Sequence, residues 1–312
     1  MTTMRSAEPN QMRQSGADLR AISASEKTLG ISLALGGGFS RGFAHLGVLE
    51  VLEQEQIHIS AIVGTSIGGL LGAAYADGIS IGQLCELGSR VRLRDFIRYQ
   101  KLGRIEIGQQ EPSQNAHRYD LIGRFVREWF RARRIEELSI PTAIVTTDLD
   151  TCAPHVFTRG PLEVAIRASC AFPGLFQPVE HEGKCLADGC IVAPVPTAAA
   201  ARMNDCCVIG VAVGSSTLNP PSSENVVKVF KRPFRGQSAP APDTSWTRHA
   251  DLVLQPEVHH IGWNDFSRGD EARAAGAEAM RLALPHVREI LARQSQVRLA
   301  ERASTGAQAG WA

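Results

Sequence analysis

Long apolar runs and a secretory leader are both missing from this chain of 312 residues. No uninterrupted stretch approaches the roughly 18–20 apolar residues that are needed to cross a bilayer. The polar amino-terminal segment 1–28 contains arginines but no apolar core like that of a signal peptide. We therefore expect a cytoplasmic protein, soluble or peripherally bound to a membrane, with residues 1–28 as a disordered leader.

A strong net charge and metal-type cysteine spacing are missing too. The formal net charge is +1, and no pattern of aromatic and basic residues points to nucleic acid, so we expect no nucleic-acid partner. The seven cysteines include no C-x-x-C pair, which argues against zinc ribbons and thioredoxin-type sites. Their odd number and irregular spacing favour a reduced compartment. No metal or other cofactor is indicated.

Alternating apolar segments predict an α/β fold with a mostly parallel central sheet. A buried strand over 29–35 precedes a helix over 41–56, and a second strand over 57–63 precedes a second helix. Strand, helix, strand and helix at this spacing imply βαβ units. Further elements are expected as strands over 141–147, 183–187, 208–213 and 251–254, and as helices over 119–130, 162–168 and 270–294. We expect one domain over 29–295 and a flexible tail over 296–312.

A serine stands at a sharp turn in the segment Gly64-Thr65-Ser66-Ile67-Gly68. The segment follows an apolar strand and precedes an Ala-rich helix, so it predicts a strained elbow with Ser66 at its apex. Gly64 and Gly68 allow the strand and the helix to pass closely. The Ser66 hydroxyl would then lie at a helix N-terminus, where developing negative charge is stabilised. Taken alone, the pattern also arises by chance in glycine-rich turns of α/β proteins.

Two further segments offer what ester hydrolysis at a serine requires, a proton acceptor and donors aimed at the oxyanion. Asp188, followed by Gly189, ends a predicted strand at the rim where parallel sheets place their sites, although an aspartate that caps a turn fits the same pattern. Gly36-Gly37-Gly38 ends the first strand, and its unhindered N–H groups can point at an anion. These glycines lack the G-K-[ST] ending of a phosphate loop, so we expect no nucleotide.

The segment 90–134 is strongly basic. It contains 12 Lys and Arg against 5 Asp and Glu, which is a net charge of +7. Two interpretations stay open for it. It is either a solvated helical face or a cap beside the active site whose cationic side meets anionic lipid headgroups, with each basic residue contributing roughly 1 kcal/mol.

Together these motifs resemble the patatin-like phospholipase family, in particular its bacterial branch related to neuropathy target esterase. The resemblance covers about residues 29–290. The motifs that carry it are GGGFSRG (36–42), AHLGVL (44–49), GTSIGG (64–69), IRASCAFPGLF (166–176), DG (188–189) and PVP (194–196). Several motifs in the order typical of the family identify it more specifically than any single motif does.

The resemblance implies a three-layer α/β/α fold and hydrolysis of acyl esters in phospholipids or lysophospholipids by a Ser–Asp dyad without histidine. Ser66 would be the nucleophile, and Asp188 the general base within hydrogen-bonding reach of it. The backbone amides of Gly36, Gly37 and Gly38 would form the oxyanion hole, with Arg41 supporting that loop. No cofactor is implied.

Two residues depart from the family pattern, and two other functions stay open. Phe39 stands where a fourth glycine is common, and Cys190 stands where glycine or alanine usually follows Asp-Gly. An ordinary Ser–Asp–His triad would use a histidine at position 249, 259 or 260, whereas we interpret His45 as structural. A non-catalytic protein that binds membrane lipids on the same scaffold is the other possibility.

Overall fold

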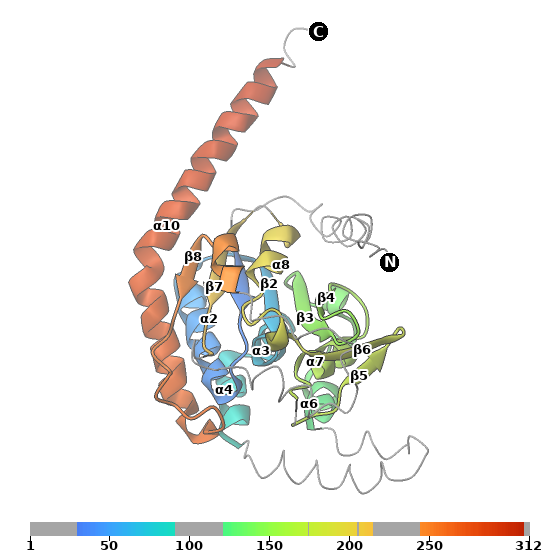
Figure 1. The fold of residues 1–312 in the computed structure, drawn as a ribbon. Helices are drawn as coiled ribbons and strands as arrows, with labels where there is room; N and C mark the ends of the chain where they lie inside the picture. Colours follow the sequence, from blue (N-terminus) through green and yellow to red (C-terminus); the bar gives the residue numbers. More distant parts are fainter. Residues whose placement is uncertain (1–29, 91–120, 174, 205, 215–243, 309–312) are drawn as a thin grey trace, which may run out of the picture.

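Eight strands join into one mixed sheet in the computed structural model, which describes residues 30–90, 121–173, 175–204, 206–214 and 244–308 (Figure 1). The predicted leader and most of the predicted cap therefore lie outside the described residues. The sheet order is β5-β6-β3-β2-β1-β7-β8, and β4 pairs with β3. The strands are β1 (Ile31–Leu35), β2 (Ile59–Thr65), β3 (Thr142–Asp148), β4 (Ala153–Phe157), β5 (Val179–His181), β6 (Lys184–Asp188), β7 (Cys207–Val211) and β8 (Leu252–Leu254).

Parallel pairing holds in the centre of the sheet, as predicted, and fails on one side. β1 pairs in parallel with β2 and β7, β2 with β3, and β7 with β8. β6 instead runs antiparallel to β3 and to β5. Glu182 and Gly183 between β5 and β6 both have positive φ, the geometry of a tight hairpin turn that folds one strand back on the other. Asp188 thus ends a strand, as predicted, but that strand is one of the antiparallel members of the mostly parallel sheet.

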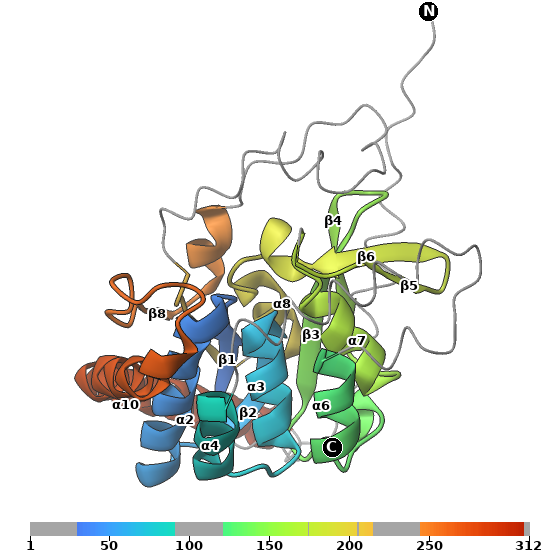
Figure 2. The same ribbon diagram turned by 90° about the horizontal axis from the view of Figure 1, so that it is seen from below.

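Strand residues alternate between two helical layers, which makes the fold a three-layer α/β/α arrangement. Large side chains such as Leu33, Ile62 and Ile209 pack toward one set of helices, while smaller ones such as Ala34 and Ala143 face the other layer. The first layer holds α2 (Ala44–Gln54), α3 (Ile67–Ala76), α4 (Ile81–Arg90), α6 (Leu121–Trp129), α7 (Leu162–Ser169) and α10 (Gly269–Gln308) (Figure 2). α8 (Thr197–Met203) covers the opposite face.

The closing helix α10 packs along α2 and then continues beyond the sheet (Figure 1). The two helices approach closely because both carry glycine at the contact. A Cβ at Gly47 would lie 1.9 Å from the Arg273 carbonyl oxygen, and one at Gly276 would lie 1.9 Å from that of Ala44. The helix extends to Gln308, so most of the segment expected as a flexible tail is helical.

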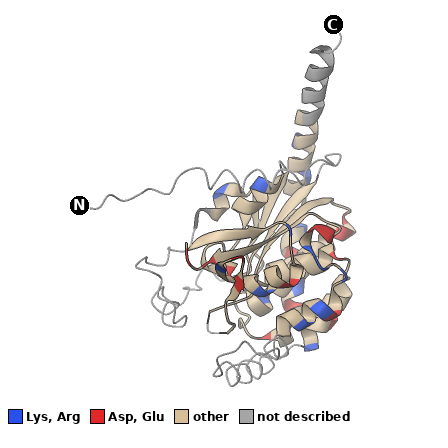
Figure 3. Cartoon of the chain, turned by 90° about the vertical axis from the view of Figure 1, so that its right-hand side faces the viewer, with Lys and Arg blue, Asp and Glu red and all other residues tan. Residues whose placement is uncertain are grey.

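The described part of the basic segment is the helix α6 and the turn after it, as the sequence predicted. Three of its arginines are paired with carboxylates: Arg124 with Glu128 at 2.7 Å, Arg127 with Glu163, and Arg134 with Glu136 at 2.8 Å. The guanidinium of Arg133 instead donates to the Arg127 carbonyl oxygen, and Arg131 has no ion pair with a described carboxylate. Basic and acidic residues are interspersed over the helices (Figure 3). Among the described helices, none is long and apolar enough to cross a membrane.

Candidate active site

Ser66 occupies the elbow between β2 and α3. Its backbone has φ 55° and ψ −125°, a conformation that costs free energy for any residue other than glycine. The elbow needs glycine on both sides. A Cβ at Gly64 would lie 2.4 Å from the Gly69 Cα, and one at Gly68 would lie 2.3 Å from the Leu35 carbonyl oxygen. The serine is nearly buried, with an exposed fraction of 5%.

Sheet register brings Ser66 and Asp188 together. Thr65 pairs with Val145 of β3, and the next residue of β3, Thr146, pairs with Asp188 of β6. The end of β2 and the end of β6 therefore flank the same short stretch of β3. The Ser66 Oγ donates a hydrogen bond of 2.7 Å to the Asp188 Oδ2, across 122 residues of sequence.

Burial changes the acid–base chemistry of Asp188, whose side chain is fully buried. Desolvation raises the pKa of this carboxyl from 3.8 to about 6, against the opposing effect of hydrogen bonds from the Cys190 backbone N–H and the Ser66 hydroxyl. The Cys190 N–H lies 2.9 Å from Oδ1 and orients the carboxylate. At neutral pH the group is mostly ionised, and it is a stronger base than an exposed aspartate.

Ser169 holds the elbow in place, a role that the sequence did not reveal. Its Oγ accepts a hydrogen bond of 2.8 Å from the Ser66 backbone N–H and donates one of 2.6 Å to the Val145 carbonyl oxygen. A second hydroxyl, that of Thr147, donates to the Asp188 carbonyl oxygen at 2.8 Å. The one feature of the sequence that could have indicated this role is the position of Ser169 inside the IRASCAFPGLF motif.

The three glycines predicted as oxyanion donors are not equivalent. The Gly36 N–H donates to the Val211 carbonyl oxygen at 3.0 Å, and the Gly37 N–H donates to that of Pro194 at 3.1 Å. Both amides are therefore already engaged, which corrects the expectation that all three point at an anion. Among the described residues, the Gly38 N–H has no hydrogen-bond acceptor and stays a candidate.

Gly37 nevertheless lies against Cys190 and Ser66. A Cβ at this position would come 2.0 Å from the Cys190 Sγ and 3.2 Å from the Ser66 Cβ. Only glycine leaves room for the cysteine that departs from the family pattern. The Cys190 side chain thus packs on the glycine loop, beside the serine.

His45 supports the glycine loop and does not act as a base. Its Nε2 lies 2.7 Å from the Gly36 carbonyl oxygen, which only accepts, so Nε2 carries the proton. Complete burial lowers the pKa of the ring from 6.5 to about 4. The neutral imidazole fixes the orientation of the peptide between Gly36 and Gly37, and its structural interpretation from sequence is supported.

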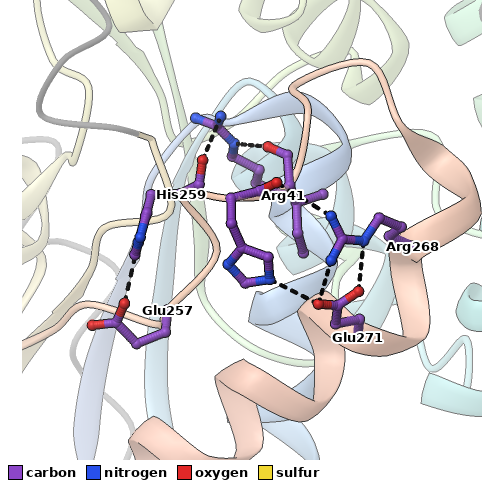
Figure 4. A network of polar contacts seen from close by, with 7 residues as sticks. Arg41, Glu257, His259, Arg268 and Glu271 are labelled. Carbon is purple, nitrogen blue, oxygen red and sulfur yellow. Dashed lines mark hydrogen bonds and ion pairs between the residues drawn. The ribbon is translucent and has the colours of Figure 1, made fainter.

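Arg41 joins the glycine loop to a distant loop of the chain (Figure 4). Its backbone N–H donates to the Gly38 carbonyl oxygen at 3.2 Å. Its guanidinium donates to the carbonyl oxygens of Ile261, at 2.7 Å, and His259, at 3.3 Å. The side chain is buried, so both loops are held together away from solvent.

The three histidines of the alternative triad have other surroundings than Ser66 and Asp188, and the first of them, His249, is exposed. His259 pairs with Glu257 at 3.1 Å, and His260 pairs with Glu271 at 2.7 Å (Figure 4). Among the described residues, no histidine side chain bonds Ser66 or Asp188. The hydroxyl of Ser66 is therefore paired with a carboxylate and not with an imidazole.

A cavity of about 180 Å³ opens beside Ser66. Its walls come from α3, α4, α6 and the turn after the glycine loop, with rings such as Phe39, Phe43 and Phe125. Among the described residues that line it, only Ser66 has a side chain with nitrogen or oxygen. Such a surface accommodates a hydrocarbon chain and offers nothing to bind a charged group.

Comparison with known proteins places this α/β architecture among the patatins. The sequence model of patatin-like phospholipases matches residues 33–201, and the chain belongs to this family. Membership in this family supports lipid hydrolase activity. The α/β/α fold predicted from the motifs is confirmed.

Among its relatives, an uncharacterized NTE family protein of Mycobacterium tuberculosis is 36% identical over 195 residues, which is 61% of this chain and 51% of the relative. Human patatin-like phospholipase domain-containing protein 6 is 31% identical over 188 residues, 59% of this chain and 13% of that protein. The match thus spans about half the length of the mycobacterial relative. The crystal structure of VipD from Legionella pneumophila aligns with a TM-score of 0.47 and 14% identity, over 84% of this chain and 67% of that one.

Proposed function

We propose that the protein is a serine acyl hydrolase that cleaves carboxylic esters of phospholipids or lysophospholipids through a dyad of Ser66 and Asp188. The observation that carries the proposal is the 2.7 Å hydrogen bond between the Ser66 hydroxyl and the buried Asp188 carboxylate. The apolar cavity beside Ser66 supports it, because an acyl chain seated there would bring its ester to the serine. A histidine is not required, because burial strengthens the aspartate as a base.

Acylation begins when Ser66 attacks the ester carbonyl. The Oγ–H bond breaks as Asp188 takes the proton, and Oγ bonds to the acyl carbon. Negative charge on the carbonyl oxygen is stabilised by the Gly38 N–H and by the N-terminus of α3, whose first-turn N–H groups lack intrahelical acceptors. The loss of one such donor costs roughly 3–4 kcal/mol in comparable hydrolases.

Collapse of the tetrahedral intermediate cleaves the carbon–oxygen bond to the leaving alcohol, which receives the proton from Asp188. Water then attacks the acyl-enzyme, and Asp188 accepts one of its protons. The fatty acid leaves as Ser66 regains its hydrogen. Each step uses the same two side chains in alternating roles.

Membrane contact belongs to this proposal as well. The two arginines of α6, Arg124 and Arg127, are paired with neighbouring carboxylates, so α6 itself contributes little net attraction to an anionic surface. A cationic contribution of the segment would come from Arg131, Arg133 and its basic residues outside the described region.

The test is hydrolysis of phospholipids, lysophospholipids and short p-nitrophenyl esters by the wild type, Ser66→Ala and Asp188→Asn. Ser295→Ala and the exposed Asp150→Asn are matched controls remote from the dyad. We expect both dyad variants to lose turnover by at least about a thousandfold and both controls to keep it. A fluorophosphonate probe should label the wild type and not Ser66→Ala. Native protein that neither labels nor turns over would favour a non-catalytic lipid-binding protein.

A further inference from the structure

Three aromatic rings form a ridge at the surface beside the glycine loop. Phe39 contacts Phe172 on one side, with ring centroids 5.9 Å apart, and Trp263 on the other, at 5.2 Å. Both pairs are edge-to-face, with interplanar angles of 88° and 81°. The rings of Phe39 and Phe172 are half-buried, and Trp263 is 39% exposed. We call these three residues the aromatic ridge.

The aromatic ridge is continuous with the cavity that contains Ser66. Phe39 lines the cavity and follows directly after Gly38, the candidate oxyanion donor. Phe266, three residues beyond Trp263, lines the same cavity. A molecule that contacts the aromatic ridge would therefore lie next to the space proposed for an acyl chain.

Backbone hydrogen bonds hold the loop that presents Trp263. The Ser40 hydroxyl lies 2.8 Å from the carbonyl oxygens of both Gly262 and Trp263, and the Ser40 N–H donates to the latter at 3.1 Å. Arg41 binds the same loop at Ile261 (Figure 4). Because these bonds use main-chain oxygens, they persist when the Trp263 side chain is removed. The exposed indole is consequently not needed to fold the loop.

The described charged side chains near the aromatic ridge give no net attraction to anionic lipid. Glu257 pairs with His259, and Glu271 pairs with both Arg268 and His260. Asp265 adds a further carboxylate, which accepts from the Ser267 backbone N–H and hydroxyl. A surface with this balance would bind lipid through its rings, with little dependence on salt.

We propose that the aromatic ridge docks the protein on the interfacial region of a zwitterionic phospholipid membrane. The tryptophan ring is favoured at this depth, where its apolar body meets hydrocarbon and its N–H meets water, and the phenylalanine rings add apolar surface beside it. The proposed function, on which this inference rests, and the apolar cavity next to the ridge identify phospholipid as the partner. Docking would place the cavity mouth at the membrane, from which an ester can enter.

Vesicle binding tests the inference without turnover. Every protein carries Ser66→Ala, so that no lipid is hydrolysed, and is sedimented with phosphatidylcholine vesicles at low and high salt. Trp263→Ala is expected to weaken partitioning about tenfold, or ~1.4 kcal/mol, at both salt concentrations. The matched control is Trp129→Ala, which removes a tryptophan with an exposed fraction of 40% at the end of α6 and should bind normally.

A second measurement leaves Trp263 intact. In a protein with Trp129, Trp246 and Trp311 replaced by phenylalanine, brominated phosphatidylcholine should quench the remaining indole fluorescence. Absence of quenching, or unchanged binding of Trp263→Ala, would overturn the inference. If the protein bound only anionic vesicles, and Trp129→Ala weakened that binding, docking would be assigned to the basic segment instead. If the protein self-associated and Trp263→Ala abolished the self-association, the aromatic ridge would be assigned to a protein contact. If the wild type had no esterase activity while vesicle binding still depended on the aromatic ridge, only the proposed function would be refuted.

Discussion

Replacing Asp188 with asparagine is expected to stabilise the folded protein at neutral pH while it removes ester hydrolysis. Burial raises the pKa of this carboxyl from 3.8 to about 6, so the ionised form is less favourable in the folded protein than in the unfolded chain. That difference corresponds to a penalty of up to about 3 kcal/mol above pH 6. Asparagine carries no charge and avoids the penalty.

The penalty depends on pH with a definite sign. Below pH 3.8 the carboxyl is protonated in both states, so the preference of the folded protein for the protonated form stabilises it fully. That contribution is lost as the pH rises through about 6. The stability difference between Asp188→Asn and the wild type should therefore be less than about 1 kcal/mol at pH 4 and should approach 3 kcal/mol at pH 7.

Hydrogen bonding does not oppose this expectation. The amide oxygen of asparagine can accept from the Cys190 N–H, and its amino group can donate to the Ser66 Oγ, which accepts equally well. Urea unfolding at pH 4 and pH 7 measures the difference, with the exposed Asp150→Asn as the control. A gap of the same size at both pH values, or a less stable Asp188→Asn at pH 7, would refute the assignment of Asp188 as a desolvated base.

Three further outcomes follow from the site. The kcat/KM for a neutral soluble ester should fall about tenfold per pH unit below about 6, because Asp188 must be ionised to accept a proton; a flat profile down to pH 5 would contradict this role. Gly37→Ala should reduce kcat by about a hundredfold or more, since its Cβ would collide with the Cys190 Sγ, and the double variant with Cys190→Gly should recover part of the loss. Ser169→Ala should destabilise the protein by about 1–3 kcal/mol, measured by urea unfolding, because two buried hydrogen bonds at the Ser66 elbow are lost.

Much of the local geometry could be predicted from the sequence because neighbouring residues impose it. The elbow is an example: a serine between glycines, after a β-branched run and before an Ala-rich run, leaves few backbone solutions. The central parallel strands were predictable for a similar reason, since strand–helix alternation restricts how consecutive elements can pair. The helix after the glycine loop was displaced, beginning at Ala44 after a 3₁₀ turn over Phe39–Phe43.

Other properties of the site depend on contacts between distant segments. Gly36 and Gly37 appear in sequence as donors like Gly38, yet Val211 and Pro194 occupy their N–H groups in the fold. Nothing in the local sequence shows that these carbonyl oxygens arrive there. Which amide faces an oxyanion is decided by packing.

By itself, the chain determined the strained serine, the glycines around it and the layered α/β architecture, because steric limits on φ and ψ and the alternation of apolar residues act over a few positions. Only the tertiary structure decided that β6 folds back along β3, that Asp188 thereby reaches Ser66, and that its carboxylate loses its water. A hydrogen bond across 122 residues and a pKa of about 6 both depend on which atoms surround a group, and those atoms come from strands far apart in the sequence.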